Sequence, residues 1–133
     1  MIPLIVRYAE DQQTAGRLAL QHLQLTHLGD RMAAAGNLLV DILLAVLKGA
    51  SLQDTITNKI KSQDHPLLGF PFMRWLADPD EAVIGKRFSS ACYVEDALPA
   101  TVYLALKYHH DAYRGLIANT NLGGDNAGRG AVL

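Results

Sequence analysis

Apolar residues recur along most of the chain at the three- and four-residue spacings of an amphipathic helix. Between residues 11 and 23 these positions are Ala15, Leu18, Ala19 and Leu23. Side chains at this spacing share one helix face. Residues 30–48 follow the same rule, and we expect their face with Leu38, Ile42 and Val46 to be buried. No segment alternates with the two-residue period of a strand, so the sequence predicts an all-α fold.

Capping residues delimit the predicted helices. Asp30 can accept from free backbone N–H groups at the start of the 30–48 helix, and Lys48 and Gly49 close it. Ser51, with Asp54 three positions later, resembles a capping box that opens a helix over 52–61. Further predicted helices are a short one over 71–77 carrying Trp75, one starting at 78–81, one over 95–108 with Pro99 in its first turn, and one from Asp111 to about 119. The total is about six or seven helices.

The loop over residues 65–71, which contains Pro and Gly, separates two helical blocks. We interpret it as a connection inside one domain, so residues 1–133 are predicted to form a single helical domain. Asp125 can cap a last helix, whose pattern is expected to continue to Leu133 without a glycine stop. This ending suggests that the chain is cut there.

Composition narrows the classes of function. The chain is half apolar, and its 12 basic and 13 acidic residues leave a formal net charge of −1, which offers no positive field for nucleic acid or an anionic membrane surface. The longest apolar stretch, 38–47, is interrupted by Asp41 and is about half the ~20 residues of a bilayer span. Residues 1–6 lack the features of a signal peptide, and the single Cys92 has no partner for an internal disulfide, so we expect a cytoplasmic location.

Residues 121–125, with the sequence NLGGD, are the most informative motif for chemistry. Gly123 and Gly124 permit a sharp turn that can aim the Asp125 carboxylate into a cleft, although a turn with a helix cap explains the same letters. His27 is either a ligand-binding side chain or a structural one. His109 and His110 point to different sides of a helix end and lack the spacing of a two-histidine metal site.

Three segments, in this order and spacing, carry a resemblance to a known family. Residues 95–106, 111–113 and 121–125 resemble the C-terminal region of the ADP-ribosylglycohydrolase family, and residues 25–49 resemble its middle segment. The resemblance covers about residues 10–133. It implies a helical array corresponding to the C-terminal part of the family fold, without the N-terminal half. It also implies hydrolysis of a glycosidic bond of ADP-ribose with two magnesium ions held by carboxylates.

The same resemblance assigns candidate site residues. It places His27, Cys92, Tyr93, Gly123 and Gly124 around bound ADP-ribose, while catalytic residues stay unassigned. For Cys92, a small buried apolar group is the alternative interpretation, and residues 91–93 as a whole can equally be the apolar entry to a helix.

The family's metal ligands are only partly present. They are a Thr-Asp-Asp signature in the N-terminal half and an Asp-x-Asp-Thr group after the two glycines. Here no Thr-Asp-Asp string occurs, and Ala127 and Gly128 stand where the second Asp and the Thr are expected, so only Asp125 is left as a magnesium ligand. Arg129, one turn later, can form a salt bridge with Asp125 or contact an anion instead.

Two functional hypotheses follow. The chain is part of a glycohydrolase that becomes active when a missing N-terminal half completes the cleft, or it is a catalytically inactive helical module that binds ADP-ribose or serves a structural role. An incomplete helical array exposes apolar faces, so we also expect a homo-oligomer or a complementing chain.

Overall fold

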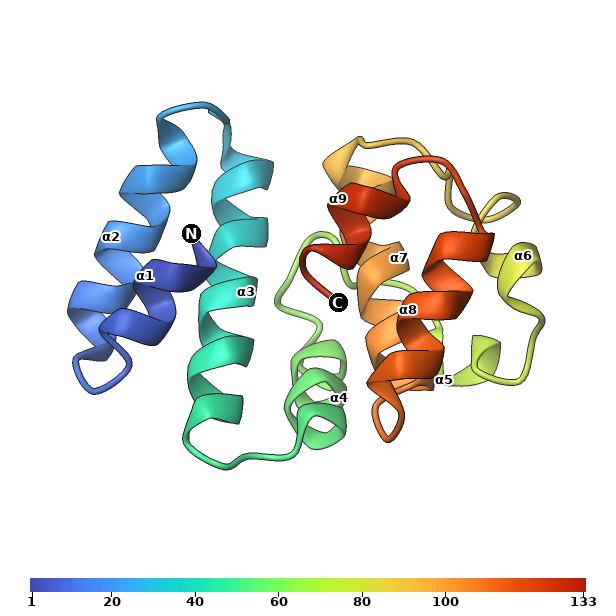
Figure 1. Ribbon diagram of the computed structural model, residues 1–133, viewed down its shortest axis with the longest axis horizontal. Helices are drawn as coiled ribbons and strands as arrows, with labels where there is room; N and C mark the ends of the chain where they lie inside the picture. The colour runs from blue at the N-terminus through green and yellow to red at the C-terminus, as the bar shows by residue number, and fades with distance from the viewer. The chain divides into compact units, whose positions relative to one another are not determined.

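The computed structural model describes residues 1–133 as nine α-helices without a strand, which confirms the all-α prediction (Figure 1). The helices fall into two compact units, Met1–Pro66 and Leu67–Leu133, here called unit 1 and unit 2. Their boundary lies inside the Pro- and Gly-containing stretch 65–71. That residues 1–133 form one domain stays a prediction.

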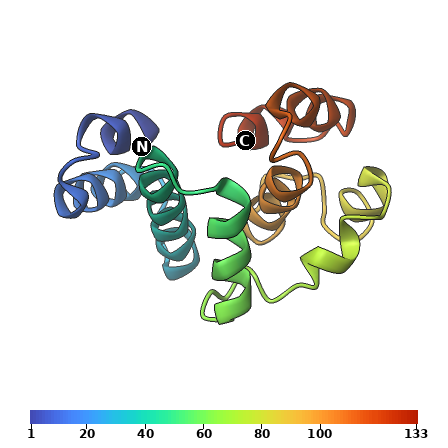
Figure 2. The same cartoon turned by 90° about the horizontal axis from the view of Figure 1, so that it is seen from below.

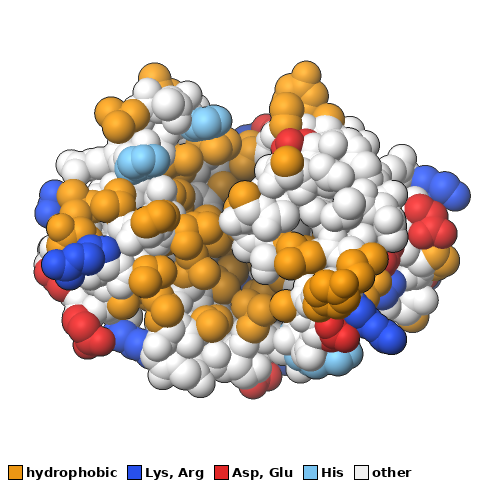
Figure 3. All heavy atoms as spheres, viewed as in Figure 1, with side chains coloured by type: hydrophobic (Ala, Val, Ile, Leu, Met, Phe, Trp, Pro, Cys, Tyr) orange, Lys and Arg blue, Asp and Glu red, His pale blue; other side chains and the backbone are white.

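Unit 1 contains four helices, α1 (Ile2–Arg7), α2 (Gln12–Gln24), α3 (Asp30–Leu47) and α4 (Leu52–Ser62). Helices α1, α2 and α3 pack against one another, and α4 packs on α3 (Figures 1 and 2). The core of the three-helix group consists of Ile5, Ala15, Ala19, Val40 and Leu44. Small alanines let α1 and α3 approach α2 closely. Apolar side chains also gather over the helices of this unit on the face seen in Figure 3.

The buried face predicted for α3 is largely confirmed. Leu38 and Ile42 are 2% and 8% exposed, while Val46 near the helix end is half-buried. Gly36 lies where α3 meets α2: a Cβ there would come within 2.6 Å of a Leu23 methyl group. A side chain at position 36 would therefore force the ends of Leu23 and Leu20 to move.

Side-chain hydrogen bonds cap three helix starts, and they confirm the caps predicted at Ser51 and Asp111. The side chain of Asp11 accepts from the Thr14 N–H at 3.0 Å, and that of Ser51 accepts from the Asp54 N–H at 3.2 Å. Asp111 accepts from the Arg114 N–H at 3.0 Å. Each bond satisfies one of the backbone donors that a helix start leaves unpaired.

Two other predicted caps are wrong. The N-cap of α3 is Gly29, and Asp30 is the first residue of the helix; its charge still favours the positive helix end. Asp125 occupies the N-cap position of the last helix, but its side chain makes no capping hydrogen bond.

Unit 2 contains α5 (Phe72–Trp75), α6 (Asp80–Val83), α7 (Val94–Lys107), α8 (Ala112–Asn121) and α9 (Asn126–Gly130). Helix α7 packs against both α8 and α9, which also contact each other. Much of α7 is buried, from Pro99 through Leu104 and again at Leu106. Its central position explains its nearly continuous apolar sequence.

Aromatic side chains build a second part of the unit 2 core. Phe88 lies edge-on to Phe70 with ring centroids 4.9 Å apart, and Trp75 packs on Phe88 at 5.6 Å. Phe72 is fully buried beside them. These aromatic rings thus anchor this part of the unit 2 core.

The remaining differences concern helix number and ends. Helix α1 was not predicted, because six residues are too short to show a helical period. Pro99 lies in the second turn of α7, where its missing N–H removes one internal hydrogen bond. Helix α9 ends at Gly130, and the Leu133 N–H closes on the Arg129 carbonyl at 3.0 Å, so the helix does not continue to Leu133.

Candidate functional site: the Ser90 and Gly124 loops

The turn at residues 121–125 has the conformation that its glycines permit. Gly123 and Gly124 have φ angles of +64° and +60°, in the left-handed region that other residues avoid. They differ in their surroundings. A Cβ on Gly123 would meet nothing within 4 Å, whereas a Cβ on Gly124 would collide with the carbonyl oxygen of Ser90. Gly124 is therefore required for close contact between two loops.

Hydrogen bonds hold the second loop, residues 89–93, to the start of α7 and to the 121–125 turn. The Ser89 N–H donates to the Asp96 carboxylate at 3.0 Å, and the Ala91 N–H donates to the Ser89 hydroxyl at 3.1 Å. The Ser90 carbonyl accepts from the Asp125 N–H at 2.8 Å. We call residues 89–93 and 121–125 the loop pair, because this bond and the Gly124 contact join them.

Arg129 is the buried charge of this region, with 1% of its surface exposed. Its Nε donates to the Asn119 side-chain oxygen at 2.9 Å. Its two terminal nitrogens donate to the carbonyls of Ser90 at 3.1 Å and Gly123 at 2.6 Å, one in each loop. Burial lowers the pKa of Arg129 from its usual value, and the negative charge of Asp125 acts in the opposite direction. The salt bridge with Asp125, one of the two predicted contacts, is not formed, and the guanidinium hydrogen bonds go to neutral oxygens.

Two asparagines complete the hydrogen bonding around Arg129. Asn119, only 2% exposed, uses its oxygen for Arg129 and donates its amide to the Asn126 carbonyl at 2.7 Å. Asn126 donates its own amide to the Thr120 carbonyl at 3.2 Å. No buried side-chain nitrogen or oxygen in the chain lacks a partner. The buried cation therefore sits in a fully satisfied polar network.

The structure brings together most of the residues singled out from the sequence. Gly123, Gly124 and Asp125 lie in one loop, and Cys92 and Tyr93 end the other. Cys92 is exposed, so the alternative of a buried apolar group is wrong, and Tyr93 is 69% exposed. His27 belongs to unit 1, where it is exposed and its Nδ1 lies 2.8 Å from the Thr26 hydroxyl.

The side chains around Asp125 do not fit a two-ion magnesium site. The Asp125 carboxylate lies over Gly128, where even a Cβ would collide with it, and Ala127 adds no oxygen. No three or more His, Cys, Asp or Glu side chains gather as a metal-binding group. A magnesium ion prefers about six oxygen ligands, so one carboxylate does not define such a site.

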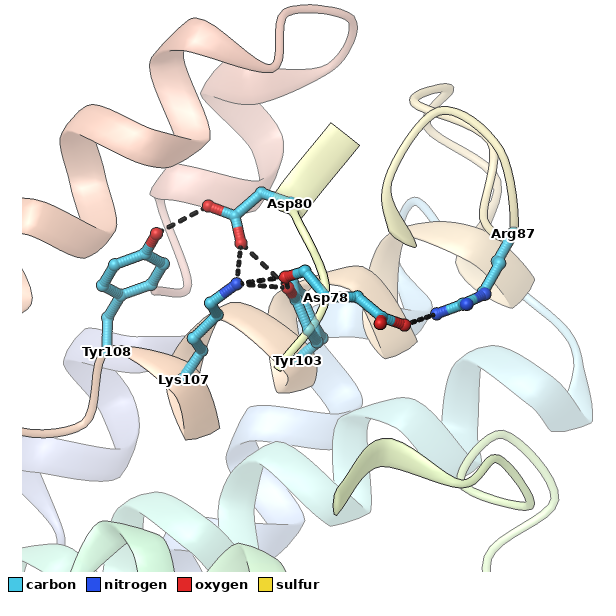
Figure 4. Close-up of polar contacts among 6 residues, drawn as sticks. All are labelled: Asp78, Asp80, Arg87, Tyr103, Lys107 and Tyr108. Carbon is cyan, nitrogen blue, oxygen red and sulfur yellow. Dashed lines mark hydrogen bonds and ion pairs between the residues drawn. The ribbon is translucent and has the colours of Figure 1, made fainter. Parts of the chain in front are cut away.

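A second polar cluster in unit 2 was not predicted from the sequence. Asp80, at the start of α6, accepts from Tyr103 at 2.8 Å, Lys107 at 2.7 Å and Tyr108 at 2.6 Å (Figure 4). Lys107 also donates to the Asp78 carbonyl at 2.6 Å. These contacts, here called the Asp80 cluster, tie α6 to α7.

The protonation states in the Asp80 cluster are set by opposing effects. Burial raises the pKa of Asp80, but the hydrogen bonds from Lys107, Tyr108 and Tyr103 outweigh it and leave the pKa below its usual value. Burial and the Asp80 charge raise the pKa of Tyr108 to about 12, and they also raise the pKa of Tyr103. The cluster is therefore an ionised carboxylate held by one ammonium and two neutral phenols at neutral pH.

A sequence signal for this cluster exists. Tyr103 and Lys107 are four residues apart on one face of an otherwise apolar helix, and buried polar groups of this kind need an acidic or carbonyl partner. Asp80 itself looked only like an acidic helix start. The partner is 27 residues away from Lys107, and its identity follows from packing, which the sequence pattern does not give.

An open pocket of about 870 Å³ lies beside the cluster. Asp80 and Tyr108 form part of its wall, and the charged side chains of Glu81, Lys86 and Arg114 line it as well. Two cations and two carboxylates give this pocket no net preference for ligand charge. It lies within unit 2 and includes Asn121 and Leu122 at the start of the loop 121–125.

The fold and the loop pair together define an all-helical protein with a glycine turn locked against a neighbouring loop. A family model described as ADP-ribosylglycohydrolase matches residues 1–133, the whole chain. The chain therefore belongs to the ADP-ribosylglycohydrolase family. Comparisons with curated proteins and with solved structures gave no match. None of the helices is both long and apolar enough to cross a membrane.

Proposed function

We propose that this chain binds ADP-ribose through the loop pair and does not, by itself, hydrolyse ADP-ribosyl bonds. The family membership supports ADP-ribose as the ligand class. The observation that carries the proposal is the contact of Gly124 and Asp125 with Ser90, because it joins the two segments that were assigned to the ligand from sequence.

The surface of the loop pair suits such a ligand. Tyr93 exposes 69% of its surface, and stacking on a base would remove an aromatic face from water. Gly124 is exposed and has no side chain, so a phosphate or ribose can approach the backbone closely. We propose that Cys92 and Tyr93 contact the adenosine part and that Gly123 and Gly124 contact the rest of the ligand.

The absence of hydrolysis follows from the available ligands. Family chemistry uses carboxylates to fix metal ions and an attacking water, and Asp125 is the one carboxylate at this turn. Waters can fill positions around an ion, but without carboxylates its occupancy is low and the attacking water is poorly oriented. Hydrolysis then requires carboxylates that this chain does not supply.

The proposed role of His27 is to donate a hydrogen bond to a phosphate oxygen of the ligand. Its ring is exposed and hydrogen-bonded only within unit 1. His27→Ala is expected to weaken ADP-ribose binding in calorimetry, and unchanged affinity would remove His27 from the proposed site.

A matched pair of glycine variants tests the binding site. Gly123→Ala and Gly124→Ala both place a Cβ at a positive φ, but only the second collides with Ser90. We expect Gly124→Ala to weaken ADP-ribose binding in calorimetry at least tenfold, and Gly123→Ala to weaken it much less. Equal affinity of Gly124→Ala and the unmodified chain would place the ligand elsewhere.

The hydrolysis part is tested separately with ADP-ribosylated protein and millimolar magnesium. The expected result is no release of ADP-ribose above a protein-free control. If the chain releases ADP-ribose and Asp125→Ala abolishes this activity, a single carboxylate suffices for hydrolysis. The requirement of magnesium for several carboxylate ligands would then be wrong.

A further inference from the structure

We infer that Arg129 is a built-in cation that positions the loop pair, so that the geometry of the pair does not depend on a divalent metal. In the family, metal-bound carboxylates follow the two glycines, as the resemblance implies. Here a guanidinium from the following helix reaches back to the same turn. The positioning role of Arg129 is independent of the proposed function, and only its consequence for ADP-ribose binding rests on that function.

The hydrogen bonds of Arg129 bridge both loops. One terminal nitrogen binds the Ser90 carbonyl and the other binds the Gly123 carbonyl, at 3.1 and 2.6 Å. The Ser90 carbonyl is also the acceptor for the Asp125 N–H. Removal of the guanidinium breaks this bridge, so the bond from the Asp125 N–H to Ser90 is the one hydrogen bond left between the loops, and the Gly123 carbonyl loses its donor.

The chemistry of the site specifies arginine. A planar guanidinium presents several N–H donors in a fixed fork, so it can bind acceptors in different directions without losing its charge. Lysine has a single nitrogen and would not span Asn119, Ser90 and Gly123 with the same geometry. A buried charge with neutral acceptors has to be surrounded closely to be tolerated, which restrains the loops that supply those acceptors.

Gly128 and Ala127 are part of the same arrangement. Position 128 has no side chain, and the Asp125 carboxylate occupies the space above it. This carboxylate lies close enough to Arg129 to act on its pKa. Residues without oxygen ligands at 127 and 128, together with the cation at 129, thus form one consistent replacement of metal coordination by an internal charge.

The experiment follows backbone amide signals of Ser90, Gly123, Gly124 and Asp125 by NMR in the full chain. Chelator, millimolar magnesium and manganese are added in turn to the unmodified protein without any ligand. The expected result is unchanged positions with chelator and magnesium and no saturable manganese broadening at these amides. Ordered signals that appear only with magnesium would overturn the inference, and so would saturable broadening at the turn.

Variants test the role of the guanidinium itself. Arg129→Met is expected to speed hydrogen exchange at the Asp125 amide at least tenfold, and Arg129→Lys to restore part of the protection. Arg114→Met is the matched control, because Arg114 is exposed and forms only a 3.6 Å pair with Asp111. Equal protection in Arg129→Met and the control would contradict the inference. If Arg129→Met does not fold, the metal additions to the unmodified chain still decide it.

The two proposals fail in distinguishable ways. Metal-independent order of the turn without ADP-ribose binding keeps the role of Arg129 and removes the proposed function. If ADP-ribose binds but the turn is ordered only with magnesium, the proposed binding function is kept and the role of Arg129 is removed.

Discussion

Unit 1 and unit 2 are both helical, but different interactions stabilise them. The three-helix core of unit 1 is apolar, and it contains no buried polar or charged side chain. Unit 2 contains all three buried polar side chains of the chain, Thr101, Asn119 and Arg129, together with the Asp80 cluster. Apolar packing is non-directional, whereas hydrogen-bonded charges fix the positions of specific backbone groups. The residues that could form a binding site are therefore concentrated in unit 2.

The two polar networks of unit 2 also differ from each other. Asp80 is paired with the opposite charge of Lys107, while Arg129 is surrounded by neutral oxygens. Neutral acceptors make the position of each hydrogen bond more important, since the nearby charge of Asp125 offsets only part of the cost of burial. The following predictions use these differences, beginning with the largest effect.

Arg129→Met is expected to destabilise the chain by about 4 kcal/mol, because a buried acceptor left without a donor costs about 1–3 kcal/mol and two are left so. The Asn119 oxygen and the Gly123 carbonyl would lose their donor. Urea unfolding followed by the fluorescence of Trp75, the single tryptophan and part of unit 2, measures the change. A loss below 1 kcal/mol would show that water replaces the guanidinium.

Leu44→Ala in unit 1 is expected to cost about 3 kcal/mol, because it creates a cavity in the apolar core. Leu44 is 5% exposed and packs in the three-helix cluster. Unlike the changes in unit 2, this loss should be the same at pH 4 and pH 8. Urea unfolding followed by circular dichroism checks it, and a strong pH dependence of the loss would contradict the contrast between the units.

Lys107→Met is expected to cost about 2 kcal/mol at neutral pH, because it leaves a half-buried carboxylate with two neutral donors. The pKa of Asp80 is lowered in the folded protein, so its contribution to stability is present above the unfolded value and is lost as pH falls through the folded one. Without Lys107 the folded pKa of Asp80 rises toward or above its unfolded value, so the acid-dependent loss from this group becomes smaller, and the stability difference between the two chains should shrink as pH falls below the usual carboxyl value of 3.8. Thermal unfolding between pH 2 and 7 provides the comparison; identical acid profiles would argue against a role of the ion pair.

Tyr108→Phe is expected to cost about 1 kcal/mol through the lost hydrogen bond to Asp80. Burial and the hydrogen bond to Asp80 raise the folded pKa of Tyr108 to about 12 from its usual value of 10.0. A raised pKa gives stability that is complete below the unfolded value and is lost as pH rises through the folded one. The unmodified chain should therefore lose stability between about pH 10 and 12 more steeply than Tyr108→Phe. Parallel alkaline unfolding curves would refute this.

Local patterns predicted the helices better than the site. The predicted caps at Ser51 and Asp111 and the buried face with Leu38 depend on residues a few positions apart, so the sequence contains them directly. The NLGGD turn was recognised for the same reason. The contact between Gly124 and Ser90 and the pairing of Lys107 with Asp80 join residues 34 and 27 positions apart, and only packing determines such pairs. For Arg129 the sequence suggested a salt bridge with Asp125, the acid one turn earlier, or an anion contact. In the fold its guanidinium donates to backbone carbonyls of Ser90 and Gly123 instead.

Other expectations stay predictions. They include the homo-oligomer or complementing chain, the cytoplasmic location and the contribution of His27 to a ligand site. Exposed apolar residues such as Leu25 and Leu28, at 80% and 81%, are available for self-association. Light scattering at high micromolar concentration decides between a monomer and a larger assembly.

The most direct test of the central claim is an NMR titration of the chain with ADP-ribose in the presence of chelator. The account predicts saturable shifts at the amides of Ser90, Tyr93, Gly124 and Asp125, with the same affinity after magnesium is added in excess of the chelator. The absence of shifts at the loop pair, or shifts that appear only with magnesium, would contradict it.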